Sequence, residues 1–190
     1  KKVSIMDNDK KKVLLVVNPC SGMTKKRASV EDIIEKFPDD YEFSVHKTTC
    51  MGDATNIVKR ELEDHDLVVC CGGDGTFRGA TDLYNLGIPT IGIPCTIDND
   101  ITSTDYAIGY DTAMNTAMEL ADKLRDTSQS HDRCTVIEVM GRNAGHIAVN
   151  TGIACGAIEI ITKEMPYDLD NIAKKMLEMK KTGKQNFVVV

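Results

Sequence analysis

Short hydrophobic runs alternate with longer amphipathic stretches along this chain of 190 residues. The runs have the length of buried strands, and they cover residues 13–18, 41–48, 67–71, 90–94, 134–140, 157–161 and 186–190. The stretches between them have helical length and include residues 30–36, 54–62, 112–125, 145–154 and 168–181. In the stretch 112–125, small and large apolar residues recur at helical spacing and predict one buried face, formed by Ala113, Ala117, Leu120 and Leu124.

Strands that alternate with helices predict an α/β fold of three layers, with a mostly parallel sheet and helices on both faces. The segments that begin at Val13, Leu67 and Thr90 are expected to be adjacent parallel strands. Length and the absence of a Pro/Gly/Ser-rich linker favour a single domain over residues 1–190. The chain ends inside the strand-like run 186–190, so we expect the sequence to continue beyond residue 190.

Composition narrows the possible partners and location. A net charge of −6 argues against nucleic acid as the main partner. The seven cysteines form no CxxC pair, which favours small buried hydrophobes in a reducing compartment over disulfides or zinc ligands. No apolar run approaches the roughly 20 residues of a membrane span. Together these features favour a cytoplasmic protein.

Two acidic loops follow predicted strands, and both suit phosphate chemistry. Residues 72–76 read Gly-Gly-Asp-Gly-Thr, and glycines there would let backbone N–H groups approach phosphate oxygens closely. Residues 96–100 read Thr-Ile-Asp-Asn-Asp, which can place carboxylates against a substrate hydroxyl. In a parallel sheet both loops lie beyond the carboxyl ends of the strands, where ligands bind. The pair predicts a Mg-dependent phosphoryl-transfer enzyme, although Asp98 and Asp100 could instead be turn residues that cap a helix.

An earlier motif, Asn-Pro-Cys-Ser-Gly at residues 18–22, follows the first strand and would by itself be an ordinary turn. Thr48, then Gly-Asp-Ala-Thr at 52–55, then the motif at 72–76 follow it in order. This ordered set, from about residue 12 to 76, resembles the catalytic domain of diacylglycerol kinases and related lipid kinases. The resemblance implies that ATP is contacted by Asn18, Pro19, Ser21, Gly22, Thr48, Gly72, Gly73, Asp74, Gly75 and Thr76.

From residue 72 to 190 the chain is similar to bacterial ATP-dependent 6-phosphofructokinases. The combination of the 96–100 motif with Glu-Val-Met-Gly-Arg at 138–142 carries this resemblance. It implies that Asp98 is the general base that takes the proton from the sugar 1-hydroxyl, with Thr96 and Asp100 positioning the sugar and the phosphoryl group. It also implies that Arg142 offsets charge on the transferring phosphoryl group.

The same resemblance implies the remaining ligands and partners. Asp74 and Asp100 match the Mg-associated carboxylates, and Met140 and Gly141 match positions that contact the phosphosugar. Arg133 matches a sugar-phosphate ligand that reaches into a neighbouring subunit, so a homo-oligomer is expected. In that family ATP users carry glycine at the positions of Gly75 and Cys95. Gly75 keeps that pattern, and Cys95 brings neither the charge nor the bulk of the lysine of pyrophosphate users. ATP and Mg²⁺ are therefore the expected nucleotide and metal.

The two resemblances meet at residues 72–76, so the chain reads as a recombinant of two kinase relatives. The leading hypothesis is an ATP- and Mg-dependent phosphotransferase acting on fructose 6-phosphate. We expect weak turnover from residues 1–190 alone, because part of that family's phosphosugar ligand set is missing from them. A lipid (diacylglycerol) or NAD kinase is a second hypothesis, and a nucleotide-binding or structural chimera without turnover is a third.

Overall fold

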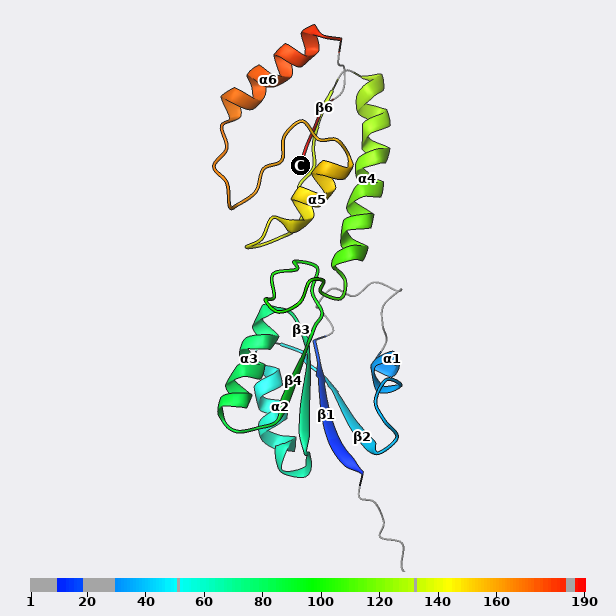
Figure 1. Ribbon diagram of the computed structural model, residues 1–190, viewed down its shortest axis with the longest axis vertical. Coiled ribbons are helices and arrows are strands. Elements are labelled where there is room, and N and C mark those ends of the chain that lie inside the picture. Colours follow the sequence, from blue (N-terminus) through cyan, green and yellow to red (C-terminus); the bar gives the residue numbers. More distant parts are fainter. Residues whose placement is uncertain (1–9, 19–29, 51, 132, 184–186) are drawn as a thin grey trace, which may run out of the picture. The chain divides into compact units, whose positions relative to one another are not determined.

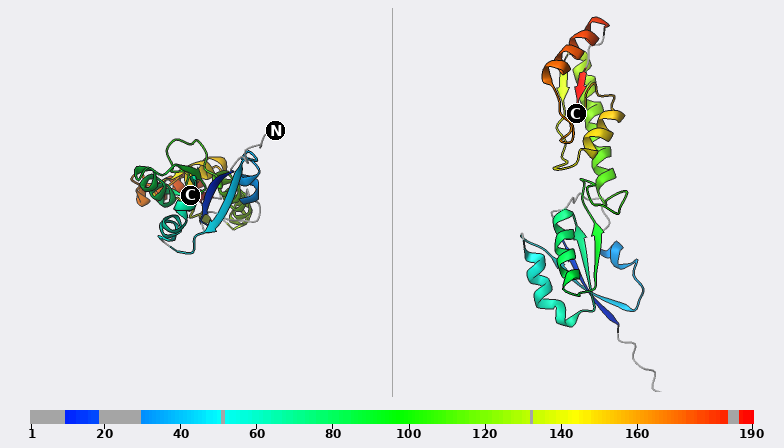
Figure 2. Two further views of the ribbon diagram at one scale, coloured as in Figure 1. Left: turned by 90° about the horizontal axis from the view of Figure 1, so that it is seen from below. Right: turned by 60° about the vertical axis from the view of Figure 1, so that its left-hand side comes forward.

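The computed structural model describes residues 10–18, 30–50, 52–131, 133–183 and 187–190. The chain forms two compact units, residues 1–96 and 97–190, each with its own core (Figures 1 and 2). The boundary follows Thr96 and does not coincide with the motif at 72–76, where the two sequence resemblances meet. A single domain spanning both units stays a prediction.

The first unit is a parallel sheet with helices on both faces. Its strands pair in the order β2-β1-β3-β4, all parallel. This confirms the prediction that the segments at Val13, Leu67 and Thr90 are neighbouring strands. In chain order the elements are β1 (Lys11–Val17), α1 (Val30–Ile34), β2 (Tyr41–Lys47), α2 (Asp53–Glu61), the 3₁₀ turn η1 (Leu62–Asp64), β3 (Leu67–Gly72), α3 (Asp74–Asn85) and β4 (Thr90–Pro94).

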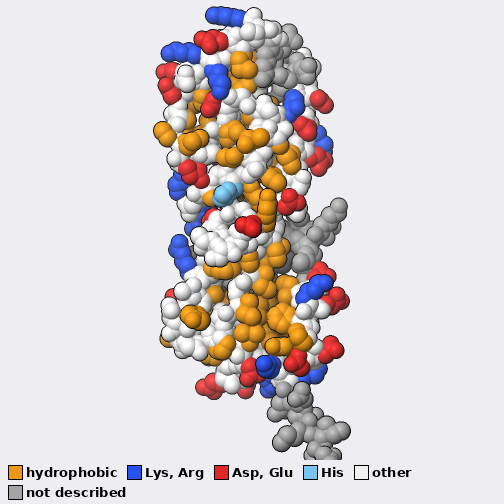
Figure 3. Space-filling view, in the orientation of Figure 1, with side chains coloured by type: hydrophobic (Ala, Val, Ile, Leu, Met, Phe, Trp, Pro, Cys, Tyr) orange, Lys and Arg blue, Asp and Glu red, His pale blue; other side chains and the backbone are white. Residues whose placement is uncertain are grey.

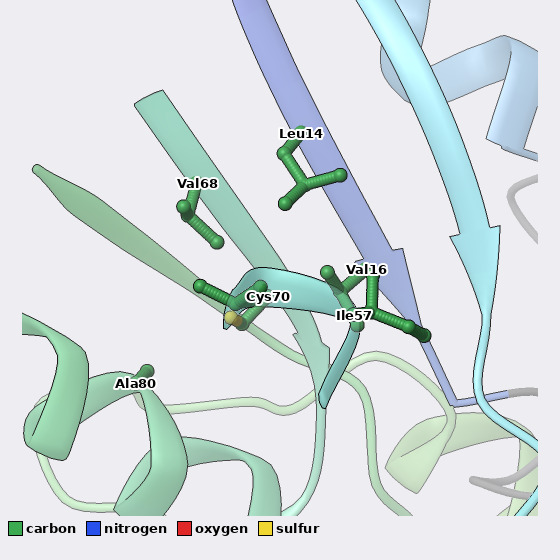
Figure 4. Close-up of a cluster of buried hydrophobic side chains, with 7 residues drawn as sticks. Leu14, Val16, Ile57, Val68, Cys70 and Ala80 are labelled. Carbon is green, nitrogen blue, oxygen red and sulfur yellow. The ribbon is translucent and has the colours of Figure 1, made fainter. Parts of the chain in front are cut away.

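Alternate residues of the central strands supply the cores on the two faces of this sheet. Leu14 and Val16 of β1 pack with side chains of β3, α2 and α3 (Figure 4). Val13, Leu15 and Val17 point the other way and pack with residues of α1. Leu14 and Leu15 are completely buried, which contributes roughly 1.5–3 kcal/mol for each side chain. Burial on both faces explains why β1 reads as a continuous apolar run and does not alternate.

The second unit is also layered around parallel strands. Its elements are α4 (Tyr110–Ser130), β5 (Cys134–Val136), α5 (His146–Ala154), α6 (Leu169–Lys181) and β6 (Phe187–Val189). β5 and β6 pair in parallel. On one face Val188 and Val190 pack with Ala121 of α4 and Ala148 of α5. On the other face Phe187 and Val189 pack with methionines of α6. The predicted α/β class with a parallel sheet and helices on both faces is therefore confirmed.

Three expectations for the second unit need correction. The strand predicted over 134–140 ends at Val136. The run 157–161 forms only an isolated parallel bridge, from Glu159 to Val189, although the Ile158 N–H also donates to the Val188 carbonyl over 2.8 Å. On α4, Leu120 and Leu124 are exposed, and the buried positions are Tyr110, Ala121 and Ser128. Small side chains let α4 pack closely against its neighbours, so alanine and not leucine occupies the contact.

Large hydrophobic side chains also reach the surface of each unit, and Figure 3 shows such side chains on one face. None of the helices in the described ranges is long and apolar enough to cross a bilayer. The cytoplasmic location stays a prediction.

Candidate functional site

A cavity of about 730 Å³ opens in the first unit beside the carboxyl ends of its strands. Asn18 and Thr48, which follow β1 and β2, line this cavity together with residues 73–76 at the start of α3. Thr96, just after β4, completes this set of predicted positions. The structure therefore brings Asn18, Thr48 and residues 73–76 of the predicted nucleotide set to one cavity, whereas Gly72 does not line it. Pro19, Ser21 and Gly22 lie outside the described residues.

The 72–76 motif joins β3 to α3, and two of its glycines have different surroundings. There is no space for a side chain at Gly72, whereas Gly75 faces open space. A Cβ on Gly72 would collide with the side chain of Thr76, so only glycine fits there. The Gly72 carbonyl accepts the N–H of Cys95 over 2.9 Å, which ties the end of β3 to the end of β4. A Cβ on Gly75 would meet nothing within 4 Å, and Gly75 lines the cavity. The backbone is therefore accessible to a ligand at Gly75.

The amino terminus of α3 gives this wall of the cavity an anion-binding character. The helix spans 12 residues, and its N-cap residue, Gly73, has no side chain with which to cap the first turn. The first N–H groups of a helix lack intrahelical partners, and the helix dipole places partial positive charge at this end. Such a terminus favours phosphate.

The loop between β2 and α2 is held in place by hydrogen bonds to the sheet and to Asp53. The Thr48 N–H donates to the Val17 carbonyl over 3.0 Å. The Asp53 carboxylate accepts the N–H of Thr49 over 2.7 Å and its hydroxyl over 2.9 Å. These bonds hold the pKa of the Asp53 carboxyl below its ordinary value. Sequence reasoning missed this positioning role of Asp53. The available signal was an acidic residue at the start of a helix, four residues after Thr49.

In the second unit, Asn99 shapes the loop that carries Asp98 and Asp100. Its backbone is left-handed, with φ 56°. Its side-chain amide donates to the Asp105 carbonyl over 3.1 Å and accepts the Ala107 N–H over 2.8 Å. The Asn99 side chain thus fixes the loop by bonding its backbone at residues 105 and 107, and Asp98 and Asp100 flank Asn99 in the sequence.

A second loop of this unit, residues 141–145, presents Arg142. Arg142 has φ 49°, a left-handed conformation that is unusual outside glycine. The Ala144 N–H donates to the Gly141 carbonyl over 2.8 Å and closes the turn. The Glu164 carboxylate accepts the Gly145 N–H over 2.7 Å, and Lys163 donates to the Asn143 side chain over 2.6 Å. Glu164 and Lys163 are positioning residues that sequence reasoning missed.

The similarity to known proteins agrees with this arrangement. The phosphofructokinase family model matches residues 6–190. The chain belongs to the phosphofructokinase family. The match extends through the segment that resembles lipid kinases.

Individual relatives of this phosphofructokinase-family chain support the assignment. An ATP-dependent 6-phosphofructokinase of Clostridium tetani is 54% identical over 123 residues, which is 65% of this chain and 39% of the relative. One of Lactobacillus delbrueckii subsp. bulgaricus is 49% identical over 132 residues, 68% of this chain and 41% of the relative. The chain thus spans about two fifths of the length of these curated relatives.

Solved structures support the fold. The Saccharomyces cerevisiae phosphofructokinase matches 100% of this chain and 32% of its own, with a TM-score of 0.71 at 20% identity, which shows a shared fold. A diacylglycerol kinase of Bacillus anthracis covers 47% of this chain and 35% of its own at 32% identity, but its TM-score of 0.36 is too low to support the lipid-kinase prediction.

The predicted site residues of this phosphofructokinase-family chain divide between the two units. Asn18, Thr48, residues 72–76 and Thr96 belong to the first unit. The others belong to the second unit, namely Asp98, Asp100, Arg133, Met140, Gly141 and Arg142. Met140 is 72% exposed, so it is not a core residue of its unit. The roles of these residues stay predictions.

The described residues contain no group of three or more His, Cys, Asp or Glu side chains placed to hold a metal ion. Mg²⁺ does not need such a group, because proteins usually bind it through one or two carboxylates together with substrate phosphates. Asp74 supplies one such carboxylate at the cavity wall. The donor set of the first unit therefore fits Mg²⁺ bound as a nucleotide complex.

The cysteines beside this site are structural. The six described cysteines are free thiols, and burial raises the pKa of Cys70 to about 11. The pKa of Cys71 is also raised, mainly by a hydrogen bond with Cys95 and to a lesser degree by burial. Both thiols of β3 therefore stay protonated and unreactive at neutral pH.

Replacing Gly141 by alanine is expected to disturb the turn that carries Arg142. A Cβ at this position would collide with the backbone carbonyl oxygen of Ala144, so the turn must open. We expect a loss of about 1–3 kcal/mol in the free energy of unfolding, measured by urea denaturation. Gly79→Ala is the matched control, because its Cβ would lie in open space within α3, where alanine stabilises by about 0.5–1 kcal/mol. Equal stability of Gly141→Ala and the unmodified chain would contradict the geometry of the turn.

The Asp53 hydrogen bonds are expected to weaken in acid. Because folding lowers the pKa of this carboxyl, its contribution is complete above the unfolded-state pKa and is lost as pH falls through the folded-state pKa. Thermal denaturation of the unmodified chain and of Asp53→Asn should show a difference at neutral pH that shrinks in acid. A difference that does not change with pH would argue against the assignment.

Proposed function

We propose that this chain is part of an ATP- and Mg-dependent phosphotransferase of 6-phosphofructokinase type, which transfers phosphate from ATP to the 1-hydroxyl of fructose 6-phosphate. The observation that carries the proposal is the cavity of the first unit, where Asn18, Thr48 and residues 73–76 meet at the amino terminus of α3. Curated relatives that are about half identical over their matched part are named ATP-dependent 6-phosphofructokinases.

In the first unit, the chain would hold the nucleotide chiefly through its backbone. Gly75 leaves space for the phosphates beside the first turn of α3, and the N–H groups of that turn would donate to phosphate oxygens. Asp74 would bind Mg²⁺, which neutralises charge on the phosphates when bound. Thr48 and Thr96 offer hydroxyl groups at the same cavity.

In the second unit, the chain would hold the acceptor and move its proton. Asp98 would accept the proton of the sugar 1-hydroxyl as general base, and Asp100 would position the phosphoryl group and share in binding Mg²⁺. Arg142 would offset the negative charge of the phosphoryl group in transfer. Met140, Gly141 and Arg133 would contact the phosphosugar, with Arg133 serving a neighbouring subunit of a homo-oligomer.

The finer history of the chain is also a proposal. The order of Asn18, Thr48 and residues 72–76 along the chain favours a lipid-kinase-like segment over residues 12–76, joined to the phosphofructokinase-like remainder. The shared motif at 72–76 would let such a junction keep the strand, loop and helix in register. This origin predicts that the first unit binds nucleotide, and it does not predict which molecule accepts the phosphate.

A coupled assay of ADP release distinguishes the candidate functions. Mg-ATP is supplied with fructose 6-phosphate, with diacylglycerol in mixed micelles, or with NAD. ADP release that depends on fructose 6-phosphate is the expected result, at a low rate for residues 1–190 alone. Release with diacylglycerol or NAD only would overturn the proposed acceptor. Nucleotide binding without release for any acceptor would indicate a binding protein without turnover.

A further inference from the structure

Three charged side chains follow one side of α3 along the nucleotide cavity. Asp74, Arg78 and Asp82 are spaced four residues apart, so they lie above one another on the helix, and all three line the cavity. Among the described lining residues, Arg78 is the sole cation. The charged wall of the cavity therefore carries one positive charge between two negative ones.

Within the described part of the chain, no contact of Arg78 explains its position. Its side chain is exposed, and within the described ranges it makes no ion pair or hydrogen bond with another residue. Asp74 and Asp82 stand one turn before and one turn after it, at the spacing of helical ion pairs, yet neither is paired with it. A guanidinium that has no partner among the described residues can offer its five N–H donors to a ligand.

The helix also leaves room for a ligand beside Arg78. Gly75 and Gly79 flank it on α3 and line the same cavity, and a Cβ on either would meet nothing within 4 Å. One turn of helix separates Arg78 from Asp74, a rise of about 6 Å. An extended arginine side chain spans a similar distance, so it reaches the space beside the first turn.

We propose that Arg78 is a ligand of the nucleotide polyphosphate, a role that rests on the proposed nucleotide site. A nucleoside triphosphate brings about four negative charges into a wall that already holds two carboxylates, and one bound Mg²⁺ offsets only part of this repulsion. The guanidinium forms paired, charge-assisted hydrogen bonds with phosphate oxygens. Arg78 thus adds side-chain charge to a site that otherwise binds phosphate through the backbone.

Calorimetric titration of the chain with Mg-ATP, Mg-ADP and adenosine tests this role. Arg78→Gln is expected to weaken Mg-ATP and Mg-ADP about 10- to 100-fold and to leave adenosine affinity unchanged. Arg78→Lys keeps the charge but not the paired donors, so its affinity for Mg-ATP should lie between that of Arg78→Gln and that of the unmodified chain. Lys59→Gln is the matched control, because Lys59 is an exposed cation on α2 that does not line the cavity.

The outcomes separate this inference from the proposed function. Equal Mg-ATP affinity of Arg78→Gln and the unmodified chain would overturn the role of Arg78 and leave the proposed site intact. An equal loss of adenosine and Mg-ATP affinity would also overturn it, because the side chain would then contact the nucleoside. Failure of the unmodified chain to bind Mg-ATP at all would overturn the proposed function and the role of Arg78 together.

Discussion

Replacing Asp98 by asparagine is expected to lower turnover with fructose 6-phosphate by on the order of 10²–10⁴, with Mg-ATP affinity preserved. Asparagine keeps the size of the side chain and one of its acceptor oxygens, but it does not accept the proton of the sugar hydroxyl. The cavity proposed to bind the nucleotide lies in the first unit, and Asp98 lies in the second, so the substitution leaves the lining residues of the cavity unchanged. The rate is measured by coupled ADP release and the affinity by calorimetry.

Asp105→Asn is the control for this prediction. Asp105 is an exposed carboxylate of the same loop, and only its backbone carbonyl holds the Asn99 side chain. The substitution removes the same charge and should leave turnover within a few-fold of the unmodified chain. Turnover that survives Asp98→Asn would refute the role of Asp98 as general base. An equal loss in both variants would show that the loss reflects charge or loop structure.

Gly75→Val is expected to weaken Mg-ATP binding by roughly 10- to 100-fold. A Cβ at this position would point into open space at the cavity wall, so the valine would occupy volume assigned to phosphate. The Cβ of the valine meets no atom within 4 Å, and the first unit should therefore keep its sheet. Binding is measured by calorimetry and the fold by circular dichroism.

Thr81→Val provides the matched control for the valine. Thr81 lies on the same helix, is exposed and does not line the cavity. It carries the same β-branched side chain to a different side of α3, so it should bind Mg-ATP as the unmodified chain does. If Gly75→Val also binds Mg-ATP normally, the phosphates do not lie against this wall.

The central strands of the first unit, β1 and β3, could be predicted from the sequence because they are buried on both faces. β1 and β3 are nearly continuous apolar runs, and their pairing in parallel follows from the helices between them. The strands of the second unit were predicted less well. The run 134–140 alternates between half-buried and exposed residues throughout, yet only its first three residues form a strand. The parallel pairing with β6 ends at Val136 opposite Val189, and the Ile137 N–H still donates to the Val189 carbonyl over 2.8 Å. The neighbour's length, and not the alternation of the run, therefore decided the length of this strand.

The helices show a similar division. α3 was not among the predicted helices, because two glycines and a threonine fill its first turns. Its packing against the sheet through Ala80 outweighs their low helix propensity. On α4 the apolar spacing predicted a buried face that included Leu120 and Leu124, but both are exposed, and Ala121 is the fully buried alanine that packs with α5. Periodicity alone did not distinguish these two faces.

The candidate site could be predicted at the level of motifs but not of contacts. Asn18, Thr48 and residues 73–76 meet at one cavity as the parallel-sheet argument requires. The residues that hold the loops, such as Asp53, Asn99 and Glu164, act through backbone N–H groups far from the motifs or inside turns. The Asp53 contact is local and leaves a signal in the sequence, an acidic residue four positions after a threonine. The contacts of Asn99 and Glu164 depend on three-dimensional placement and leave no such signal.

Hydrogen–deuterium exchange with and without saturating Mg-ATP tests most directly whether the cavity of the first unit is the nucleotide site. Mass spectrometry of the peptides locates the protected backbone. We predict that Mg-ATP slows exchange in peptides that cover residues 46–55 and 72–83. In the Gly75→Val variant, the same nucleotide concentration should slow exchange of these peptides less than in the unmodified chain. Binding of Mg-ATP by calorimetry without protection in either region would contradict the account.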